Sequence, residues 1–213
     1  MWIKFWNVFT KITAWPIQKI KFGTKVCYED KSLQNRHIKG PAVIVSNHTS
    51  VFDYAVLLFV FWSRDLHTLI AELQFEKPIL GRILKWLGGI RVDRNSFDFS
   101  FIAKSERILK NGGVILAFPE GRIPLETEEK PLEFKSSAAY IALSAGVPVV
   151  PVYTEGNYGS GKARVIVGVP MRFDELINSD LPDKEIITRA NDEIRNKVIE
   201  LGRSLNEKTE KSC

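Results

Sequence analysis

Short apolar runs alternate with longer segments of helical periodicity from residue 42 to the end of the chain. Strands repeat at a period of two and helices at a period of 3.6, so this alternation predicts an α/β domain. We expect a mixed, largely buried central sheet that is flanked by helices. The expected strands are Ala42–Ser46, Leu66–Ala71, Gly89–Asp93, Val114–Phe118, Val147–Tyr153 and Arg164–Gly168. The expected helices are Val51–Trp62, Pro78–Leu87, Phe97–Lys110, Ser137–Ala145 and a segment from Asp183 to about Leu205.

Two of the expected strands carry further information about the sheet. The run 114–118 is apolar at every position, which suits a strand that is covered on both faces. The run 147–153 contains Pro148 and Pro151, which have no N–H to donate to a neighbouring strand. We therefore expect this strand at an edge or a bulge of the sheet, where it suits the wall of an apolar groove and core packing equally well.

The first 22 residues carry an amphipathic pattern of a different kind. Large apolar side chains recur at helical spacing, and Lys4, Asn7 and Lys11 fall on the opposite side. We expect a helix that ends near Trp15 and Pro16, with a second short amphipathic piece after the proline. Aromatic residues opposite lysines are typical of a helix that lies in a membrane interface, and packing on the protein's own core is the alternative. The apolar residues are Trp2, Phe5, Trp6, Phe9 and Ile12.

These patterns divide the chain into three parts. Residues 1–25 are the expected amphipathic membrane anchor, residues 26–205 are the folded domain, and residues 206–213 are a charged tail that frays. The longest apolar run, 54–62, is far shorter than the roughly 18 residues that span a bilayer. We therefore expect a protein that rests on a membrane face.

Composition limits the chemical classes of binding partner but does not select one of them. Of the 213 residues, 45% are hydrophobic, which is enough for a substantial core. The net charge of +5 favours anionic partners, which include nucleic acid, phospholipid head groups and phosphorylated substrates. The basic residues are spread along the chain without a nucleic-acid-binding motif, so we expect no nucleic acid partner. The two cysteines, Cys27 and Cys213, show no metal-ligand spacing, and we expect no metal.

A base and a carboxylate occur where a buried strand passes into a helix, in the stretch NHTSVFD at 47–53. His48 and Asp53 can meet if His48 precedes the helix and Asp53 lies in its first turn, with Ser50 as the N-cap. The same residues fit a capping box in which Asp53 only stabilises the start of the helix. This stretch alone leaves both interpretations open.

Two later stretches place charged residues at the ends of expected strands. Arg94 follows the strand 89–93, and its guanidinium suits a phosphate. The stretch FPEGR at 118–122 ends the most apolar strand, where the proline interrupts the hydrogen bonds between strands and the glycine allows a turn.

The stretch 156–163 nearly fits a phosphate-binding loop, but Ala163 replaces the usual Ser or Thr and a strand follows. We expect a hairpin-like loop there.

Four of these blocks, in this order, resemble the glycerolipid acyltransferase family, most closely the bacterial 1-acylglycerol-3-phosphate acyltransferases. The family signature is N-H-x-x-x-x-D, then a strand-ending G-x-I-x-x-D-R, then F-P-E-G, then V-P-x-V-P. The matching residues are 47–53, 88–94, 118–121 and 147–152. The resemblance covers about residues 40 to 170.

The resemblance implies transfer of a fatty acyl chain from an acyl thioester to the free hydroxyl of 1-acylglycerol-3-phosphate, which forms phosphatidate. His48 would act as general base, and Asp53 would hold its imidazole. The resemblance names no oxyanion stabiliser, and backbone N–H groups at the start of the helix after His48 are reasonable candidates. The remaining implied residues bind the acceptor: Arg94 and Arg122 at its phosphate with Lys135 in a lesser role, and Glu120 at a glycerol hydroxyl, within the same substrate-binding turn as Gly121.

The resemblance also implies partners and a location. No bound cofactor is expected, because the co-substrate is acyl-acyl carrier protein or acyl-coenzyme A. The implied partners are an anionic phospholipid membrane surface and a lysophospholipid acceptor, on the cytoplasmic side of the cell membrane. The alternatives are acyl transfer to another lysolipid or related alcohol, and a non-catalytic peripheral membrane protein.

One departure from the family pattern concerns the acceptor. Many members follow F-P-E-G with Thr-Arg-Ser, whereas here the residues are Arg122-Ile123-Pro124, so the arginine is shifted by one place. Ser136 and Ser137 also follow Lys135 where a glycine is common. These changes affect the implied phosphate contact and leave the chemistry implied for His48 and Asp53 unchanged.

Overall fold

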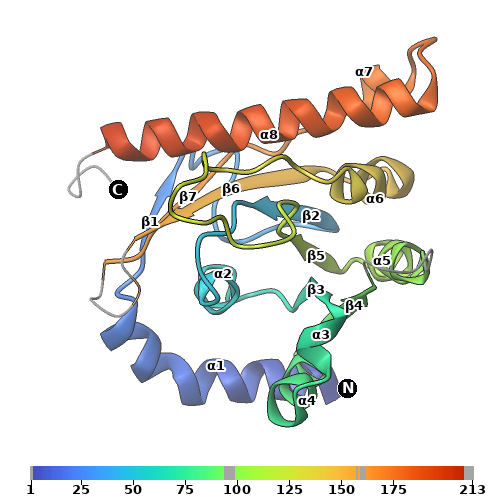
Figure 1. Ribbon diagram of the computed structural model, residues 1–213. Helices are drawn as coiled ribbons and strands as arrows, with labels where there is room; N and C mark the ends of the chain where they lie inside the picture. The colour runs from blue at the N-terminus through green and yellow to red at the C-terminus, as the bar shows by residue number, and fades with distance from the viewer. Residues whose placement is uncertain (1, 94–98, 157, 159–161, 209–213) are drawn as a thin grey trace.

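The computed structural model describes residues 2–93, 99–156, 158 and 162–208, without the side chain of Trp2. Within these ranges the chain forms a seven-stranded sheet with helices on both faces (Figure 1). The strands are β1 (Lys25–Tyr28), β2 (Ala42–Ser46), β3 (Leu66–Ala71), β4 (Ile90–Val92), β5 (Val114–Ala117), β6 (Val149–Glu155) and β7 (Arg164–Val167). The helices are α1 (Trp2–Lys21), α2 (Asp53–Val60), α3 (Glu72–Phe75), α4 (Pro78–Trp86), α5 (Ser100–Lys110), α6 (Ser137–Ala145), α7 (Asp174–Ile177) and α8 (Asp183–Glu207).

The sheet is mixed, as expected. Its strands follow the order β1-β7-β6-β2-β5-β3-β4, in which β7 runs antiparallel to β6 and the other neighbours are parallel. The alternation of strands and helices after residue 42 is therefore confirmed. The short elements β1, α3 and α7 were not predicted, because four residues are too few to show a period.

The strand with two prolines lies inside the sheet, between β2 and β7, so its expected place at an edge is wrong. The oxygen of Pro151 accepts the N–H of Gly168 at 2.8 Å, and Gly168 stands just beyond the last residue of β7. Pro151 has no N–H to donate, and it lies just beyond the last residue pair of the β6–β7 ladder. This position lets an interior strand contain a proline.

Two hydrophobic cores lie on the two faces of the sheet. Alternate residues of β2 and β5 point to opposite sides, as the pleat requires. One face carries Val43, Ile115 and the helices α5, α6 and α8, and the other carries Ile44, Leu116 and α2. Figure 1 shows the same division, with α6 and α8 on one side of the strands and α2 on the other.

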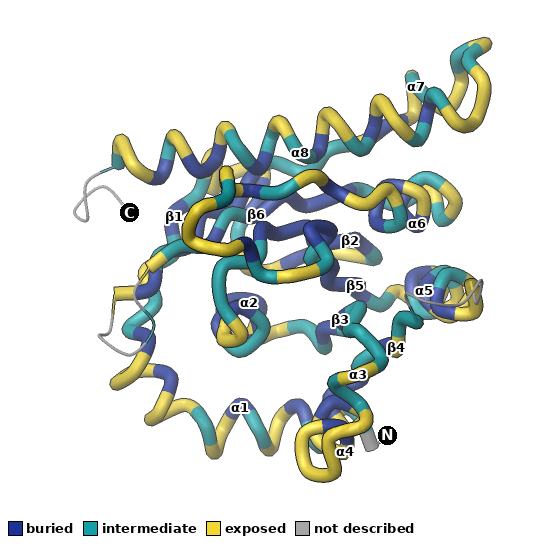
Figure 2. Tube along the Cα trace, in the orientation of Figure 1, coloured by how far each residue is buried: buried dark blue, intermediate teal, exposed yellow. Residues whose placement is uncertain are grey.

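Helix α1 lies outside α2 and α4 and is continuous through Pro16, so the expected break at the proline is wrong. Its inward side is polar. Asn7 and Lys11 are buried, and Lys11 Nζ donates to the oxygens of Trp62 and Arg64 at 2.9 and 2.8 Å. The apolar side faces outward, as the exposed outer turns of α1 in Figure 2 show.

The exposed apolar side of α1 contradicts the alternative in which this side packs on the protein's own core. Seven of its large apolar residues are between about half and four-fifths exposed: Phe5, Val8, Phe9, Ile12, Trp15, Ile17 and Ile20. Trp6 is only partly buried and stacks on Trp86 of α4, with ring centroids 4.2 Å apart. In the described part of the chain, no helix combines the length and apolarity that crossing a bilayer requires.

Candidate active site

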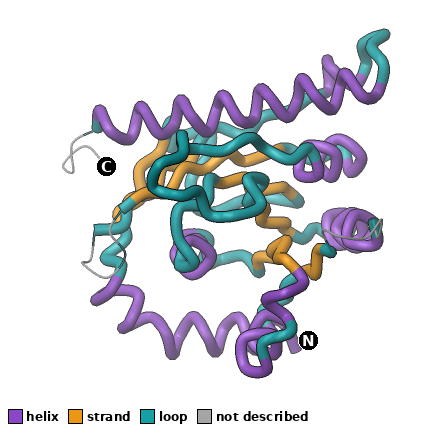
Figure 3. Tube along the Cα trace, in the orientation of Figure 1, coloured by secondary structure: helices purple, strands orange, loops and turns teal. Residues whose placement is uncertain are grey.

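The loops that follow β2 and β5 meet at one edge of the sheet. Val45 near the end of β2 pairs with Ala117, the last residue of β5, and the two strands are parallel. Their outgoing loops, 47–52 and 118–136, are therefore neighbours, and both are drawn as loop in Figure 3. This arrangement brings the His48 and Glu120 stretches together although 72 residues separate them.

Asn47 continues the sheet with its side chain. Its Nδ2 donates to the oxygen of Thr154 at 2.9 Å, and its Oδ1 accepts the N–H of Thr154 at 2.7 Å. The buried amide thus replaces one backbone rung between β2 and β6 and fixes where the loop leaves the sheet. Sequence reasoning gave Asn47 no role of its own.

His48 and Asp53 form a hydrogen-bonded pair. His48 Nδ1 lies 2.9 Å from Asp53 Oδ2, and the histidine side chain is 22% exposed while the aspartate is fully buried. The His48 ring also stacks on Phe118, with centroids 4.5 Å apart. Because Nδ1 faces a carboxylate, it carries the proton, and the Nε2 lone pair is available for a substrate hydroxyl.

The helix after His48 starts later than expected. It begins at Asp53 with Phe52 in the cap position, so the prediction of Ser50 as N-cap is wrong. The Ser50 hydroxyl instead accepts the N–H of Phe52 at 3.2 Å in a local turn. Asp53 still lies in the first turn, which is what lets residues five apart meet.

The carboxylate of Asp53 is held from several sides. Its Oδ2 accepts the N–H groups of Thr49 and Ser50 at 2.7 and 2.8 Å in addition to His48. Its Oδ1 accepts the Tyr158 hydroxyl, together with a longer contact from Thr49 Oγ1 at 3.3 Å. Burial and the charge of Asp53 raise the pKa of Tyr158, so its hydroxyl stays a donor. These bonds stabilise the ionised carboxylate and fix its plane.

Tyr158 was missed because nothing in its spacing marks it. It lies in the connection between β6 and β7, which form the expected antiparallel hairpin. Its ring contacts Phe22 at the end of α1 and Phe52 beside the helix start, with centroids 6.0 and 6.3 Å away. Only the folded hairpin brings it to Asp53.

Glu120 binds two backbone N–H groups. Its Oε1 accepts the N–H of His48 at 2.7 Å, and its Oε2 accepts the N–H of Leu132 at 2.9 Å. Burial raises the pKa of Glu120, and these two hydrogen bonds act in the opposite direction. The side chain thus joins the 118–136 loop to the backbone of His48.

Gly121 provides the turn beside Glu120. Its φ of +74° lies in the left-handed region that favours glycine. A Cβ at this position would lie 3.1 Å from Lys135 Cε and 3.3 Å from Lys135 Nζ, so the lysine side chain passes close to the turn. The structure therefore brings Lys135 to the FPEG turn.

The two arginines expected at a phosphate differ in what the structure shows. Arg94 lies outside the described residues. Arg122 forms a two-pronged pair with Glu128 at 2.5 and 2.6 Å, and its side chain is 52% exposed. Glu128 also accepts the N–H of Leu125 at 2.7 Å, so the Arg122–Glu128 pair cross-links the segment 122–128. A phosphate would have to compete with Glu128 for Arg122.

Four of the backbone N–H groups around the start of α2 already have partners. The N–H of His48 is bound to Glu120, those of Thr49 and Ser50 to Asp53, and that of Phe52 to Ser50. These donors therefore cannot also hold an oxyanion, because each has one proton to donate. Among the described residues there is no cluster of three metal-ligating side chains.

Comparison with known proteins identifies a family and several similar proteins. The family model described as Acyltransferase matches residues 25–155. The human 1-acyl-sn-glycerol-3-phosphate acyltransferase beta is 30% identical over 145 residues, which are 66% of this chain and 51% of that protein. The Bacillus subtilis 1-acyl-sn-glycerol-3-phosphate acyltransferase is 26% identical over 171 residues, 78% of this chain and 83% of that one. The chain thus spans about half the length of the human relative and most of the bacterial one.

A solved structure shares the fold. The crystal structure of the 1-acyl-sn-glycerophosphate (LPA) acyltransferase PlsC from Thermotoga maritima matches with a TM-score of 0.63 at 21% identity. The match covers 94% of this chain and 79% of that one. Since the family model spans more than half of the sequence, including both loops that build the site, the chain belongs to the acyltransferase family.

Proposed function

We propose that the protein transfers a fatty acyl chain from an acyl thioester to the free hydroxyl of 1-acylglycerol-3-phosphate, which forms phosphatidate. The observation that carries this proposal is the pair of His48 and Asp53, joined at 2.9 Å with the aspartate buried and the histidine partly open to solvent. The names of the human and bacterial relatives supply the acceptor. Family membership supplies the reaction class.

The proposed mechanism uses His48 as a general base. Its Nε2 takes the proton of the acceptor hydroxyl while the hydroxyl oxygen attacks the thioester carbonyl. The carbon–sulfur bond then breaks, and the imidazolium returns the proton to the leaving thiolate. The buried charge of Asp53 stabilises the imidazolium and keeps Nδ1 protonated. The thioester is already activated, so no serine or cysteine nucleophile is needed.

Glu120 has a positioning role in this proposal. Both of its oxygens accept backbone N–H groups, and one of these belongs to His48. The carboxylate therefore holds the backbone from which the imidazole of His48 projects. Its remaining lone pairs are left for a glycerol hydroxyl. The side chain of Lys135 passes beside Gly121, and we assign it as the phosphate contact at this turn.

A second acceptor class is favoured by one observation. Arg122 is already paired with Glu128, so an acceptor without a phosphate monoester would not need to displace that carboxylate. Another lysolipid or a related alcohol is therefore the alternative substrate. The donor in either case is acyl-acyl carrier protein or acyl-coenzyme A.

The proposal includes attachment to the cytoplasmic side of the cell membrane through α1. The outward side of α1 carries Ile12 at 62% and Ile20 at 78% exposure, and Ile79 of α4 beside it is 77% exposed. In Figure 2, exposed turns of α1 and α4 lie at the same end of the molecule. Exposed apolar surface of this extent is typical of a membrane-contacting face.

The acyl-transfer assay tests the reaction. Purified protein is given several lysolipid acceptors with both thioester donors, and product is measured by mass. His48→Ala should lower kcat by at least about 100-fold, because a general base contributes that much, while its melting temperature stays near that of the wild type. Undiminished turnover in His48→Ala would rule out His48 as the general base. No turnover with any acceptor would favour a non-catalytic peripheral membrane protein.

Tyr158→Phe tests how Asp53 is held. The change keeps the ring contacts with Phe22 and Phe52 and removes the hydroxyl that donates to Asp53. We expect kcat to fall about 3- to 10-fold, the equivalent of one hydrogen bond. Tyr140→Phe on α6 is the matched control, and equal kcat values for the two variants would contradict the role of Tyr158.

A further inference from the structure

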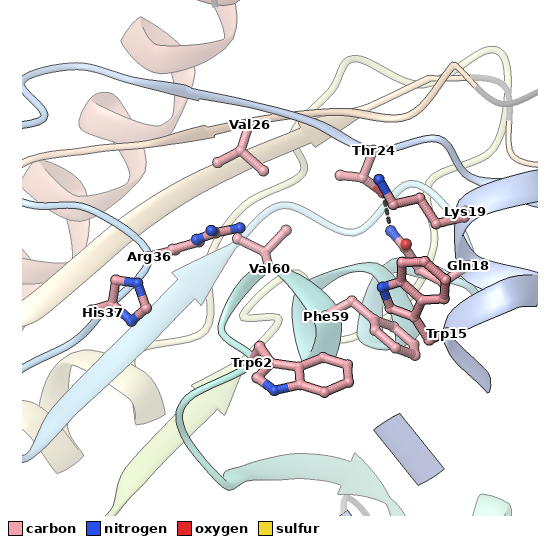
Figure 4. A pocket seen from close by; sticks show the side chains of 10 residues that line it. All are labelled: Trp15, Gln18, Lys19, Thr24, Val26, Arg36, His37, Phe59, Val60 and Trp62. Atoms are coloured by element: carbon pink, nitrogen blue, oxygen red, sulfur yellow. Dashed lines mark hydrogen bonds between the residues drawn. The ribbon is translucent and has the colours of Figure 1, made fainter. Parts of the chain in front are cut away.

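A cavity of about 330 Å³ lies beside the carboxyl end of α2, the opposite end from Asp53. It is formed by α1, β1, α2 and the loop before β2 (Figure 4). Three basic side chains, Lys19, Arg36 and His37, line it, and its lining includes no carboxylate. The other lining residues are Trp15, Gln18, Thr24, Val26, Phe59, Val60 and Trp62.

The cations in this cavity have no carboxylate partner in the described part of the chain. Lys19 Nζ lies 5.8 Å from the centroid of the Trp15 ring, a cation–π contact that brings no negative charge to the lysine. His37 is oriented by Ser63, whose Oγ is 3.2 Å from Nδ1. Figure 4 shows Arg36 entering from one side and Lys19 from the other, on α1. Two like charges around a concave surface favour an anion between them.

The mouth of the cavity is aromatic and continues the apolar side of α1. Trp15 belongs to both surfaces and is half exposed, and Trp62 on the other side is 42% exposed. Tryptophan side chains favour the depth of lipid headgroups, where one end of the ring is apolar and the other is wet. If α1 lies on a membrane, Lys19 and Arg36 are at the depth of phosphate groups.

We propose that this cavity binds the phosphate of an anionic phospholipid headgroup, with Lys19 and Arg36 as its charged ligands. The hydrogen-bonded pair of Gln18 Nε2 and Thr24 Oγ1, 3.0 Å apart, adds polar atoms to the same wall. The inference rests on the membrane attachment proposed above. It is separate from the acceptor site, because α2 lies between this cavity and Asp53.

A soluble lipid tests the site without a membrane. Dihexanoyl phosphatidylglycerol below its critical micelle concentration is titrated into the full chain, and the indole N–H signals of Trp15 and Trp62 are followed by NMR. We expect saturable shifts that dihexanoyl phosphatidylcholine does not reproduce. The double variant Lys19→Gln/Arg36→Gln should weaken binding about tenfold or more, since each cation contributes several-fold.

A charge-matched variant separates a site from general attraction. Lys184→Gln/Arg203→Gln removes the same charge from α8, on the opposite side of the molecule from α1 (Figure 1). It should change the affinity less than twofold. Equal losses in both double variants, or no indole shifts at all, would overturn the site.

Inorganic phosphate distinguishes the source of the ligand. Inorganic phosphate alone, at about the concentration of the soluble lipid, should neither shift the two indole signals nor displace the lipid. Full displacement would assign the cavity to a free phosphate and overturn the lipid assignment. His48→Ala should bind the soluble lipid like the wild type, so failure of the acyl-transfer proposal and failure of this one are separate results.

Discussion

Helices α1 and α8 are both long and amphipathic, and they face the protein with opposite sides. Helix α8 buries an apolar stripe against the sheet and α6, with Ile194 only 1% exposed, and its charged residues face solvent. Helix α1 buries Asn7 and Lys11 and turns its aromatic side outward. The same kind of sequence pattern therefore gave two inverse packings.

The surfaces under the two helices explain the difference. Helix α8 lies on strands, which present apolar side chains. Helix α1 lies on the turn that follows α2 and on the carboxyl end of α4, where backbone carbonyl groups have no partner within a helix. Lys11 donates to the oxygens of Trp62 and Arg64 in the turn after α2, and Asn7 Nδ2 lies 3.5 Å from the oxygen of Leu87, the C-cap residue of α4.

Within the described residues, the rest of the chain therefore leaves the apolar side of α1 uncovered. Helix α8 contributes its apolar side to folding. Helix α1 contributes its polar side to folding and keeps its apolar side for the proposed membrane contact. Amphipathicity alone did not reveal this division.

Truncating one isoleucine on each helix is the strongest test of the contrast. Ile194→Ala should lower the free energy of unfolding by about 2 to 5 kcal/mol, because it opens a cavity in the core. Ile12→Ala, at a position that is 62% exposed, should change it by less than about 0.5 kcal/mol. Urea denaturation in detergent-free buffer measures both. Equal costs would mean that the apolar side of α1 is packed within the protein after all.

Removing one lysine on each helix should give a smaller difference. Lys11→Ala leaves buried carbonyl oxygens without a donor and should cost about 1 to 3 kcal/mol, visible as faster hydrogen exchange in α1. Lys197→Ala on α8 breaks a pair with Glu29 nearer the surface and should cost about 1 kcal/mol or less. Burial lowers the pKa of Lys11, which agrees with its position under the helix. If Lys11→Ala left the stability unchanged, the polar side of α1 would not be what holds the helix on the protein.

The smallest expected effect concerns the membrane. Ile12→Ser/Ile20→Ser should reduce binding to phospholipid vesicles about tenfold, or roughly 1.4 kcal/mol, while stability in solution is unchanged. Ile177→Ser is the control, because Ile177 is 42% exposed on α7, far from α1 in Figure 1. Vesicle sedimentation measures all three proteins. Loss of binding that is equal in the control would show that the apolar side of α1 is not the contact.

The sequence by itself determined the α/β alternation and the helical form of the first segment, and its spacing allowed His48 to meet Asp53. These features depend on residues close together in the chain, where period and spacing limit the geometry strongly. The order of the four blocks also identified the family, which the family model confirmed. The roles of the site residues, the donor and the cellular location stay predictions.

Only the tertiary structure decided which side of α1 faces inward, where the strand with two prolines lies, and what holds the site in place. Glu120 reaches the N–H of His48, and Tyr158 reaches Asp53, across 72 and 105 residues of chain. No local period encodes such contacts. They arise because parallel strands bring their outgoing loops to one edge, and because the segments that follow α2 and α4 expose carbonyl groups that a lysine and an asparagine can bind.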